Sequence, residues 1–371
     1  MIPGKAMSFV KSFITVLLFL CFTYAEDNAL EKDITDGYLD DFSKIEAAFI
    51  LSGAVEDSME YYLDWYTKLQ KTIREFNLEF NEPAETARII FTYLHSQWLK
   101  TYAKESTTLI DIVRNKEYNC VSATILYNIL CEDLTLTCSA FETPTHVYSI
   151  FNDFSNEIII ENTNDMGFNI MSNLSAYSSY LARFYPESDV LKIGLDRLYY
   201  HENSKGRPIN NTELLGLLAY NRAYFAREKK DFKTAYNFVL LAQLFNEDSR
   251  SNYNFEIGLY YDWGHELYKQ NNFADAFEVF ADGYYRFPKN KDFSKNTIVM
   301  LYNSLNDNWK TKNWPQSRQL IEEVIELDIL KTNDQKLVEG LLQNWKQYFN
   351  SIFDKELARD TEKLLARIKN E

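Results

Sequence analysis

The sequence predicts an α+β domain followed by an all-α domain of helical repeats, and three observations carry this prediction. Residues 119–165 have the pattern of one helix followed by two strands. The preceding segment, residues 39–115, has apolar residues at helical spacing. Beyond residue 210, a short motif recurs at a constant offset of 41 residues, which is typical of stacked helix pairs.

The central helix is predicted to begin at Asn119-Cys120, because apolar residues follow at helical spacing from Val121 onward. This places Cys120 in the first turn. An alternating segment follows, and then 146–151 is predicted as a strand, 152–156 as a turn and 157–161 as a second strand.

This order of residues suits an activated cysteine. A free thiol has a pKa of about 8.5, and a helix N-terminus or a neighbouring imidazolium lowers it. His146 lies on the first strand, where it could take the proton of the Cys120 thiol and return it to a leaving group. A third group must orient the imidazole. The plain alternative is that Cys120 and His146 are ordinary buried residues.

The hairpin suggests which residue that third group is. If Phe151 and Asn156 close a four-residue turn, His146 lies opposite Glu161 on the neighbouring strand. A slip of one residue would bring Asn162 opposite His146 instead, so Asn162 is the alternative orienter.

At these residues the sequence resembles the transglutaminase-like superfamily of papain-type cysteine enzymes. The resemblance covers roughly residues 85–167 and is closest to bacterial members that join such a domain to tetratricopeptide repeats. Its motifs are the helix start 118–122, the segment 144–147 and the strand end 159–163.

The resemblance implies roles for individual residues. Cys120 matches the nucleophile, His146 the base and Glu161 the third member, where the family more often has aspartate followed by proline. The side chain of the oxyanion hole has no clear counterpart, and Asn119 is the candidate for it.

The resemblance also implies a class of reaction. The enzyme would act on an amide of a peptide or protein through a Cys120 thioester. Water as acceptor gives a protease or deamidase, and an amine gives a transglutaminase. The alternative is a catalytically inactive domain of the same fold that serves as a protein-interaction module. No cofactor is expected, and the histidines and cysteines show no zinc-ligand spacing, so no metal site is expected either.

Residues 1–25 have the pattern of an export signal. Lys5 and Lys11 precede a short apolar core, and 23–25 has small residues at the two cleavage-determining positions. We therefore expect a periplasmic or secreted protein, with tethering to the membrane by an uncleaved N-terminal segment as the alternative. No later segment has the length and apolar composition of a membrane span.

The charge of the chain excludes some partners. Cleavage of residues 1–25 would remove two lysines and no acid, leaving 37 basic and 54 acidic residues, a net charge of −17. Nucleic acids and anionic membranes bind preferentially to basic surfaces, so neither is an expected partner of this acidic chain.

The mature chain keeps three cysteines, at positions 120, 131 and 138. In an oxidising compartment, Cys131 and Cys138 could pair and leave Cys120 free, or all three could stay reduced. The sequence leaves both possibilities open.

The predicted domains are residues 26–200 and residues 211–371, joined by a linker at 201–210 that is rich in polar residues and contains glycine and proline. Segments beginning at Asp231, Asn272 and Asn313 align at the 41-residue offset and resemble tetratricopeptide repeats. Residues 355–369 are predicted as a capping helix. The groove of such repeats is a candidate site for a protein partner.

Overall fold

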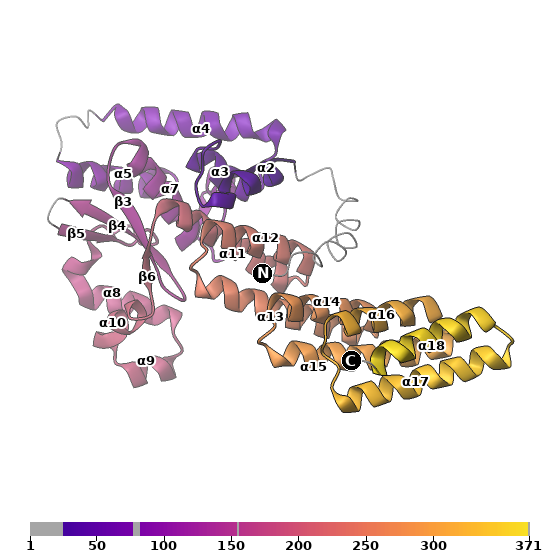
Figure 1. Ribbon diagram of the computed structural model, residues 1–371. Helices are drawn as coiled ribbons and strands as arrows, with labels where there is room; N and C mark the ends of the chain where they lie inside the picture. The colour runs from indigo at the N-terminus through magenta and orange to yellow at the C-terminus, as the bar shows by residue number, and fades with distance from the viewer. Residues whose placement is uncertain (1–24, 77–81, 154–155, 370–371) are drawn as a thin grey trace. The chain divides into compact units, whose positions relative to one another are not determined.

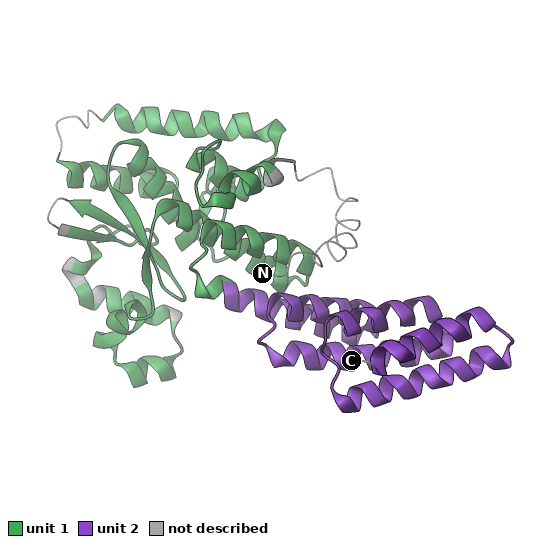
Figure 2. Cartoon of the chain, viewed as in Figure 1, with its two compact units in different colours: residues 1–252 green, residues 253–371 purple. Residues whose placement is uncertain are grey.

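The computed structural model describes residues 25–76, 82–153 and 156–369. The described chain is mostly helical, with two small sheets (Figure 1). It divides into two compact units, residues 1–252 and 253–371 (Figure 2). The export signal expected at residues 1–25 lies almost wholly outside the described residues.

The N-terminal unit begins with a group of helices that precede the cysteine. Their bounds are α2 (Ala25–Asp33), η1 (Ile34–Asp36), α3 (Lys44–Leu51), α4 (Glu56–Arg74), α5 (Pro83–Gln97) and α6 (Leu109–Asn115). The local sequence explains where three of these helices begin. Ser43 and Thr108 each cap a helix with the side chain, and Pro83 occupies the first turn of α5. Helices therefore occupy most of the described part of residues 39–115, which the sequence predicts as helical, with a short strand at Thr101–Tyr102 as the exception.

Helix α7 (Cys120–Asp133) is the buried centre of this unit. Every residue from Val121 to Cys131 is buried, so the helix is enclosed on all sides rather than on one face. It packs against α5, α6 and α11 and against strands β3 and β4. This enclosure holds the first turn of α7, which carries Cys120, in a fixed place.

The larger sheet has four antiparallel strands in the order β5-β4-β3-β6. Their bounds are β3 (Cys138–Glu142), β4 (Val147–Asp153), β5 (Asn156–Ile160) and β6 (Arg207–Ile209). The smaller sheet pairs β1 (Thr101–Tyr102) with β2 (Glu117–Tyr118) in parallel. The sequence predicts β4 and β5 but does not predict β1, β2 or β6.

Short helices connect β5 to β6 and enclose an aromatic cluster that includes Tyr177 and Tyr199. Their bounds are η3 (Ile170–Asn173), α8 (Leu174–Leu181), η4 (Ala182–Phe184), α9 (Glu187–Ile193), η5 (Leu195–Arg197) and α10 (Leu198–Asn203).

The segment 201–210, expected as a linker, is instead part of the N-terminal unit. Helix α10 runs into it, and β6 pairs with β3 within it. Gly206 is needed for close approach, because a Cβ there would lie 2.4 Å from the Phe141 ring and 2.5 Å from the Glu142 carbonyl oxygen. Pro208 is tolerated because β6 is an edge strand. Glycine and proline here mark strand pairing, not a flexible connection.

Four helix pairs follow. Their helices are α11 (Asn211–Glu228), α12 (Phe232–Phe245), α13 (Arg250–Lys269), α14 (Phe273–Arg286), α15 (Lys291–Thr311), α16 (Trp314–Glu326), α17 (Thr332–Ser351) and α18 (Lys355–Lys369). The turn inside each pair contains a residue with positive φ, and these residues recur at the 41-residue offset: Lys230, Asn271, Lys312 and Phe353. Five residues after this turn residue, every pair has a small buried residue: Ala235, Ala276, Ser317 and Ala358.

The repeat therefore has one more copy than the three aligned by sequence. Helix α18, expected as a cap, is the second helix of the fourth pair, and Asp354 accepts a hydrogen bond from the backbone N–H of Leu357 (3.0 Å) as its N-cap. The boundary between compact units also differs from the expected one, because it falls inside α13. Helix α11 contacts α3, α7 and β3, which joins the first pair to the N-terminal unit.

The C-terminal unit contains a group of half-buried carboxyl groups, Asp282 on α14 and Glu323 on α16 with Glu278 beside them. Burial, and then the charge of Glu278, raises the pKa of Asp282 to about 7. Burial, followed by the charges of Glu278 and Asp282, raises the pKa of Glu323 to about 8. These carboxyl groups make the stability of the unit depend on pH.

Candidate active site

Cys120 is the first residue of α7, and Asn119 caps the helix. The Asn119 side-chain oxygen accepts hydrogen bonds from the backbone N–H groups of Val121 (2.9 Å) and Ser122 (3.1 Å). Asparagine is among the preferred N-cap residues, which explains why the helix begins here. The partly exposed Cys120 thiol thus lies at the positive end of α7.

Asn119, expected as the oxyanion-hole side chain, has a structural role instead. Its side-chain nitrogen donates to the carbonyl oxygen of Lys104 (3.0 Å), while its oxygen caps α7. The residue is 4% exposed. Both ends of the side chain are therefore used to hold the helix start.

His146 and Glu161 meet, but through a different strand register from the expected one. Asp153 pairs with Asn156 and Ser149 with Ile160, so the register is shifted by two residues relative to the expected pairing. Side chains alternate between faces with a period of two, so a shift of two keeps both residues on the same face. His146 directly precedes β4, and Glu161 directly follows β5.

The two side chains form a buried ion pair. His146 Nε2 lies 2.7 Å from Glu161 Oε2, and the side chains are 4% and 0% exposed. The other Glu161 oxygen accepts hydrogen bonds from the backbone N–H (3.0 Å) and the hydroxyl of Thr163. Glu161 therefore has fixed partners on both oxygens and orients the imidazole.

His146 also shares a hydrogen bond with the Cys120 side chain. Since Nε2 faces Glu161, the second ring nitrogen, Nδ1, is the one left for the sulfur. Cys120, His146 and Glu161 are thus contiguous in the order that a thiol–imidazole–carboxylate triad requires.

The charges of the pair are mutually stabilised. Burial alone lowers the pKa of His146, but the charges and hydrogen bonds of Glu161 and Cys120 outweigh it, and the net pKa lies well above its usual value. Burial alone raises the pKa of Glu161, but the His146 charge and the Thr163 hydrogen bonds lower it below its usual value. The site therefore holds an imidazolium against a carboxylate.

A buried glutamate fixes the turn that carries His146. The hydroxyl of Thr143 accepts a hydrogen bond from the His146 backbone N–H (3.0 Å) and lies 2.7 Å from Glu202. Thr145 donates to the same Glu202 oxygen (2.5 Å). Glu202, on α10 and 2% exposed, is distant in sequence, so no sequence pattern pointed to it.

Asn162, the alternative orienter, contacts other residues. Its amide nitrogen donates to the hydroxyls of Ser149 (2.6 Å) and Thr124 (3.1 Å). Ser149 in turn donates to Asn128 on α7 (2.6 Å). Asn162 therefore ties the end of β5 to α7, and the imidazole is oriented by Glu161.

Cys131 and Cys138 are both buried free thiols in this structure. The side chains of Cys138 and Cys131 share a hydrogen bond. This hydrogen bond, and then burial, raises the pKa of the Cys138 thiol. Both lie away from the first turn of α7, at its last turn and at the start of β3.

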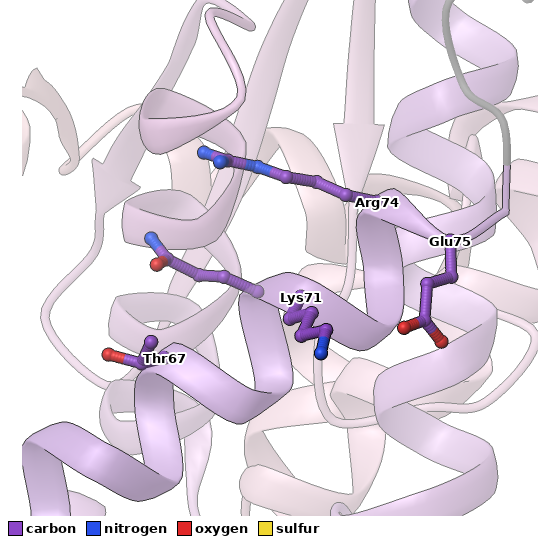
Figure 3. Close-up of a pocket in the computed structure, with 5 residues that line it drawn as sticks. Thr67, Lys71, Arg74 and Glu75 are labelled. Carbon is purple, nitrogen blue, oxygen red and sulfur yellow. The ribbon is translucent and has the colours of Figure 1, made fainter.

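Two surface depressions lie in other parts of the N-terminal unit. One, of about 330 Å³, lies along α4 and is lined by Thr67, Lys71, Arg74 and Glu75 with Gln70 (Figure 3). The other, of about 410 Å³, lies between residues 38–45 and the end of α7. Neither is lined by a member of the triad.

No protein-family model and no curated protein matches this sequence. Among the residues that the structure describes, no group of three or more His, Cys, Asp and Glu side chains is arranged to hold a metal ion. Within residues 25–76, 82–153 and 156–369, no helix is both long and apolar enough to cross a bilayer.

Proposed function

We propose that the chain is a thiol-dependent amide hydrolase or acyl transferase of the transglutaminase-like kind, acting on a peptide or protein. The observation that carries the proposal is the contiguous series of Cys120, His146 and Glu161, with a 2.7 Å contact between imidazole and carboxylate. The position of the thiol at the N-terminus of α7 adds to this support.

In the proposed mechanism, His146 holds the proton that leaves the Cys120 thiol. The thiolate forms a C–S bond with the amide carbonyl carbon, and the π electron pair moves onto the carbonyl oxygen. When that pair returns, the C–N bond breaks and the His146 imidazolium protonates the departing amine. Glu161 stabilises the imidazolium throughout without taking its proton.

The acceptor decides the second half of the reaction. Water attacking the thioester, with His146 as base, releases a carboxylic acid and gives hydrolysis or deamidation. An amine attacking in the same way gives a new amide and hence cross-linking.

The helix pairs support a second part of the proposal, a tetratricopeptide-like region that binds the substrate or a protein partner. Their regular turns and small buried residues are those of repeats that present an extended surface. Photo-crosslinking from exposed Tyr285 on α14 should capture the same proteins that the active site modifies, and exclusive capture by the N-terminal unit would contradict this part.

The test of the enzyme proposal is acylation of Cys120 by p-nitrophenyl acetate. We expect a burst of one p-nitrophenolate per chain, an acetyl group on Cys120 by mass spectrometry, and loss of both in Cys120→Ser. Adding a primary amine such as dansylcadaverine then separates the acceptors, because a transferase yields the acetyl amide and a hydrolase yields acetate. A wild-type chain that acylates no faster than Cys120→Ser would favour the catalytically inactive interaction module.

A further inference from the structure

The proposed reaction needs hydrogen-bond donors for the oxygen that becomes negative in the tetrahedral intermediate. One donor is available at the start of α7. Asn119 caps the N–H groups of Val121 and Ser122, and the N–H of Cys120 has no acceptor among the described residues. Because the Asn119 amide is bonded to Lys104, a second donor must come from another element.

Strand β1 brings a tyrosine to this position. Tyr102 pairs with Tyr118, two residues before Cys120, and the backbone N–H of Ala103 donates to the Tyr118 carbonyl oxygen (2.9 Å). Paired residues of neighbouring strands project to the same face, and the two rings meet edge to face with centroids 6.0 Å apart. The backbone thus fixes the Tyr102 ring beside the first turn of α7.

Tyr102 is also the accessible phenol of the site. Its side chain is 41% exposed, whereas Tyr118 is 5% exposed. The hydroxyl of Tyr180, on α8, is already bonded to Thr163. No hydrogen bond joins the Tyr102 hydroxyl to another described residue, so it can donate to a substrate.

The electrostatics of Tyr102 agree with a donor role. Burial, and then the charge of Cys120, raises the pKa of Tyr102 above its usual value. Its phenol therefore keeps its proton at neutral pH and stays a hydrogen-bond donor. Burial and the charges of Asp165 and Glu161 also raise the pKa of Tyr118, to about 12, so exposure rather than pKa distinguishes the two phenols.

We propose that Tyr102 completes the oxyanion hole of the Cys120 site, its hydroxyl donating to the reacting oxygen together with the Cys120 backbone N–H. This inference rests on the proposed function. As the C–S bond forms, the carbonyl π pair moves onto the oxygen, which Tyr102 then stabilises while keeping its own proton. The pair returns when the leaving group departs, so Tyr102 is unchanged at the end of the step.

The test compares two reactions of Cys120 in Tyr102→Phe. Acylation by p-nitrophenyl acetate passes through an oxyanion, whereas alkylation by iodoacetamide displaces iodide and makes none. Removing one oxyanion donor commonly costs 10²–10³ in rate, so we expect acylation to slow by about 100-fold. Alkylation should stay within about twofold of wild type. The matched control is Tyr118→Phe, which keeps the neighbouring ring and should leave both rates near wild type.

Each other outcome overturns the inference. Unchanged acylation in Tyr102→Phe means that the hydroxyl stabilises no oxyanion. An equal fall in acylation and alkylation, with unchanged circular dichroism, means that Tyr102 acts on the thiolate instead. If the wild-type chain shows no burst and alkylates like a free thiol, the proposed function itself fails, and the inference fails with it.

Discussion

Glu161→Gln should destabilise the N-terminal unit by about 3–5 kcal/mol near pH 5.5, because it removes one partner of a buried ion pair. The folded pKa of His146 is raised above its ordinary value of 6.5. The stability that His146 contributes is therefore full below pH 6.5 and is lost as pH rises through the raised pKa. The folded pKa of Glu161 is lowered below its ordinary value of 4.5. The stability that Glu161 contributes is therefore full above pH 4.5 and is lost as pH falls through the lowered pKa. Both contributions are therefore full between pH 4.5 and 6.5.

The measurement is chemical denaturation of wild type, Glu161→Gln, His146→Ala and the double variant between pH 4 and 9. The double-mutant cycle isolates the interaction between the two side chains from the cost of each change alone. The coupling should be largest in the window above and should shrink on both sides of it. A coupling that does not vary with pH would contradict the charged state assigned to the pair.

Asp282→Asn should stabilise the C-terminal unit at alkaline pH. A carboxyl group whose folded pKa is raised contributes stability that is full below the unfolded value and is lost as pH rises through the folded one. For Asp282 the stability is lost between its ordinary pKa of 3.8 and its folded pKa of about 7. The unit should therefore be less stable at pH 8 than at pH 5. One pKa unit corresponds to about 1.4 kcal/mol, and partial solvation reduces the full value, so we expect a gain of about 2–4 kcal/mol at pH 8.

Hydrogen exchange of α14 and α16 in the full chain measures this gain locally, which avoids treating two compact units as one transition. Glu323→Gln should act in the same direction, because the pKa of Glu323 is raised to about 8. The matched control is Asp307→Asn, an exposed aspartate on neighbouring α15, which should change little. Protection that rises equally in all three variants, or falls in Asp282→Asn, would contradict the account.

The thiol, the imidazole and the carboxylate can be located from the sequence because the position of each depends on a local rule. Asn119 is a preferred N-cap residue, so the start of α7 could be placed beside Cys120. The expected hairpin register was wrong by two residues, yet His146 and Glu161 still meet. A two-residue shift leaves strand faces unchanged, so the prediction of their contact did not depend on the turn.

The remaining parts of the site depend on contacts between distant residues. Strands β1 and β2 are two residues long, too short for any alternation to show, and they pair across the whole of α6. Tyr102 was missed for that reason, and Glu202 because it reaches the His146 turn from α10. The segment 201–210 was interpreted by composition, but glycine there serves the close approach of β6 to β3.

The repeats show a similar limit. Residues 231, 272 and 313 were aligned by sequence, but the fourth copy at 354 has a capping aspartate without the neighbouring aromatic or apolar pattern of the others. Its recurrence is clear in the backbone, where Phe353 takes the same positive φ as Lys312. Membership of the first pair in the N-terminal unit follows from contacts of α11 that leave no periodic signal.

The most direct test of the central claim is the rate of Cys120 alkylation by iodoacetamide at neutral pH, followed by peptide mapping. In wild type the reaction should be fast, because the N-terminus of α7 and the His146 imidazolium both favour the reactive thiolate. His146→Ala should slow it, Glu161→Gln should slow it less, and Asn162→Ala should slow it least, since Asn162 contacts Ser149 and Thr124 instead of the imidazole. Equal rates in all four proteins would contradict the triad.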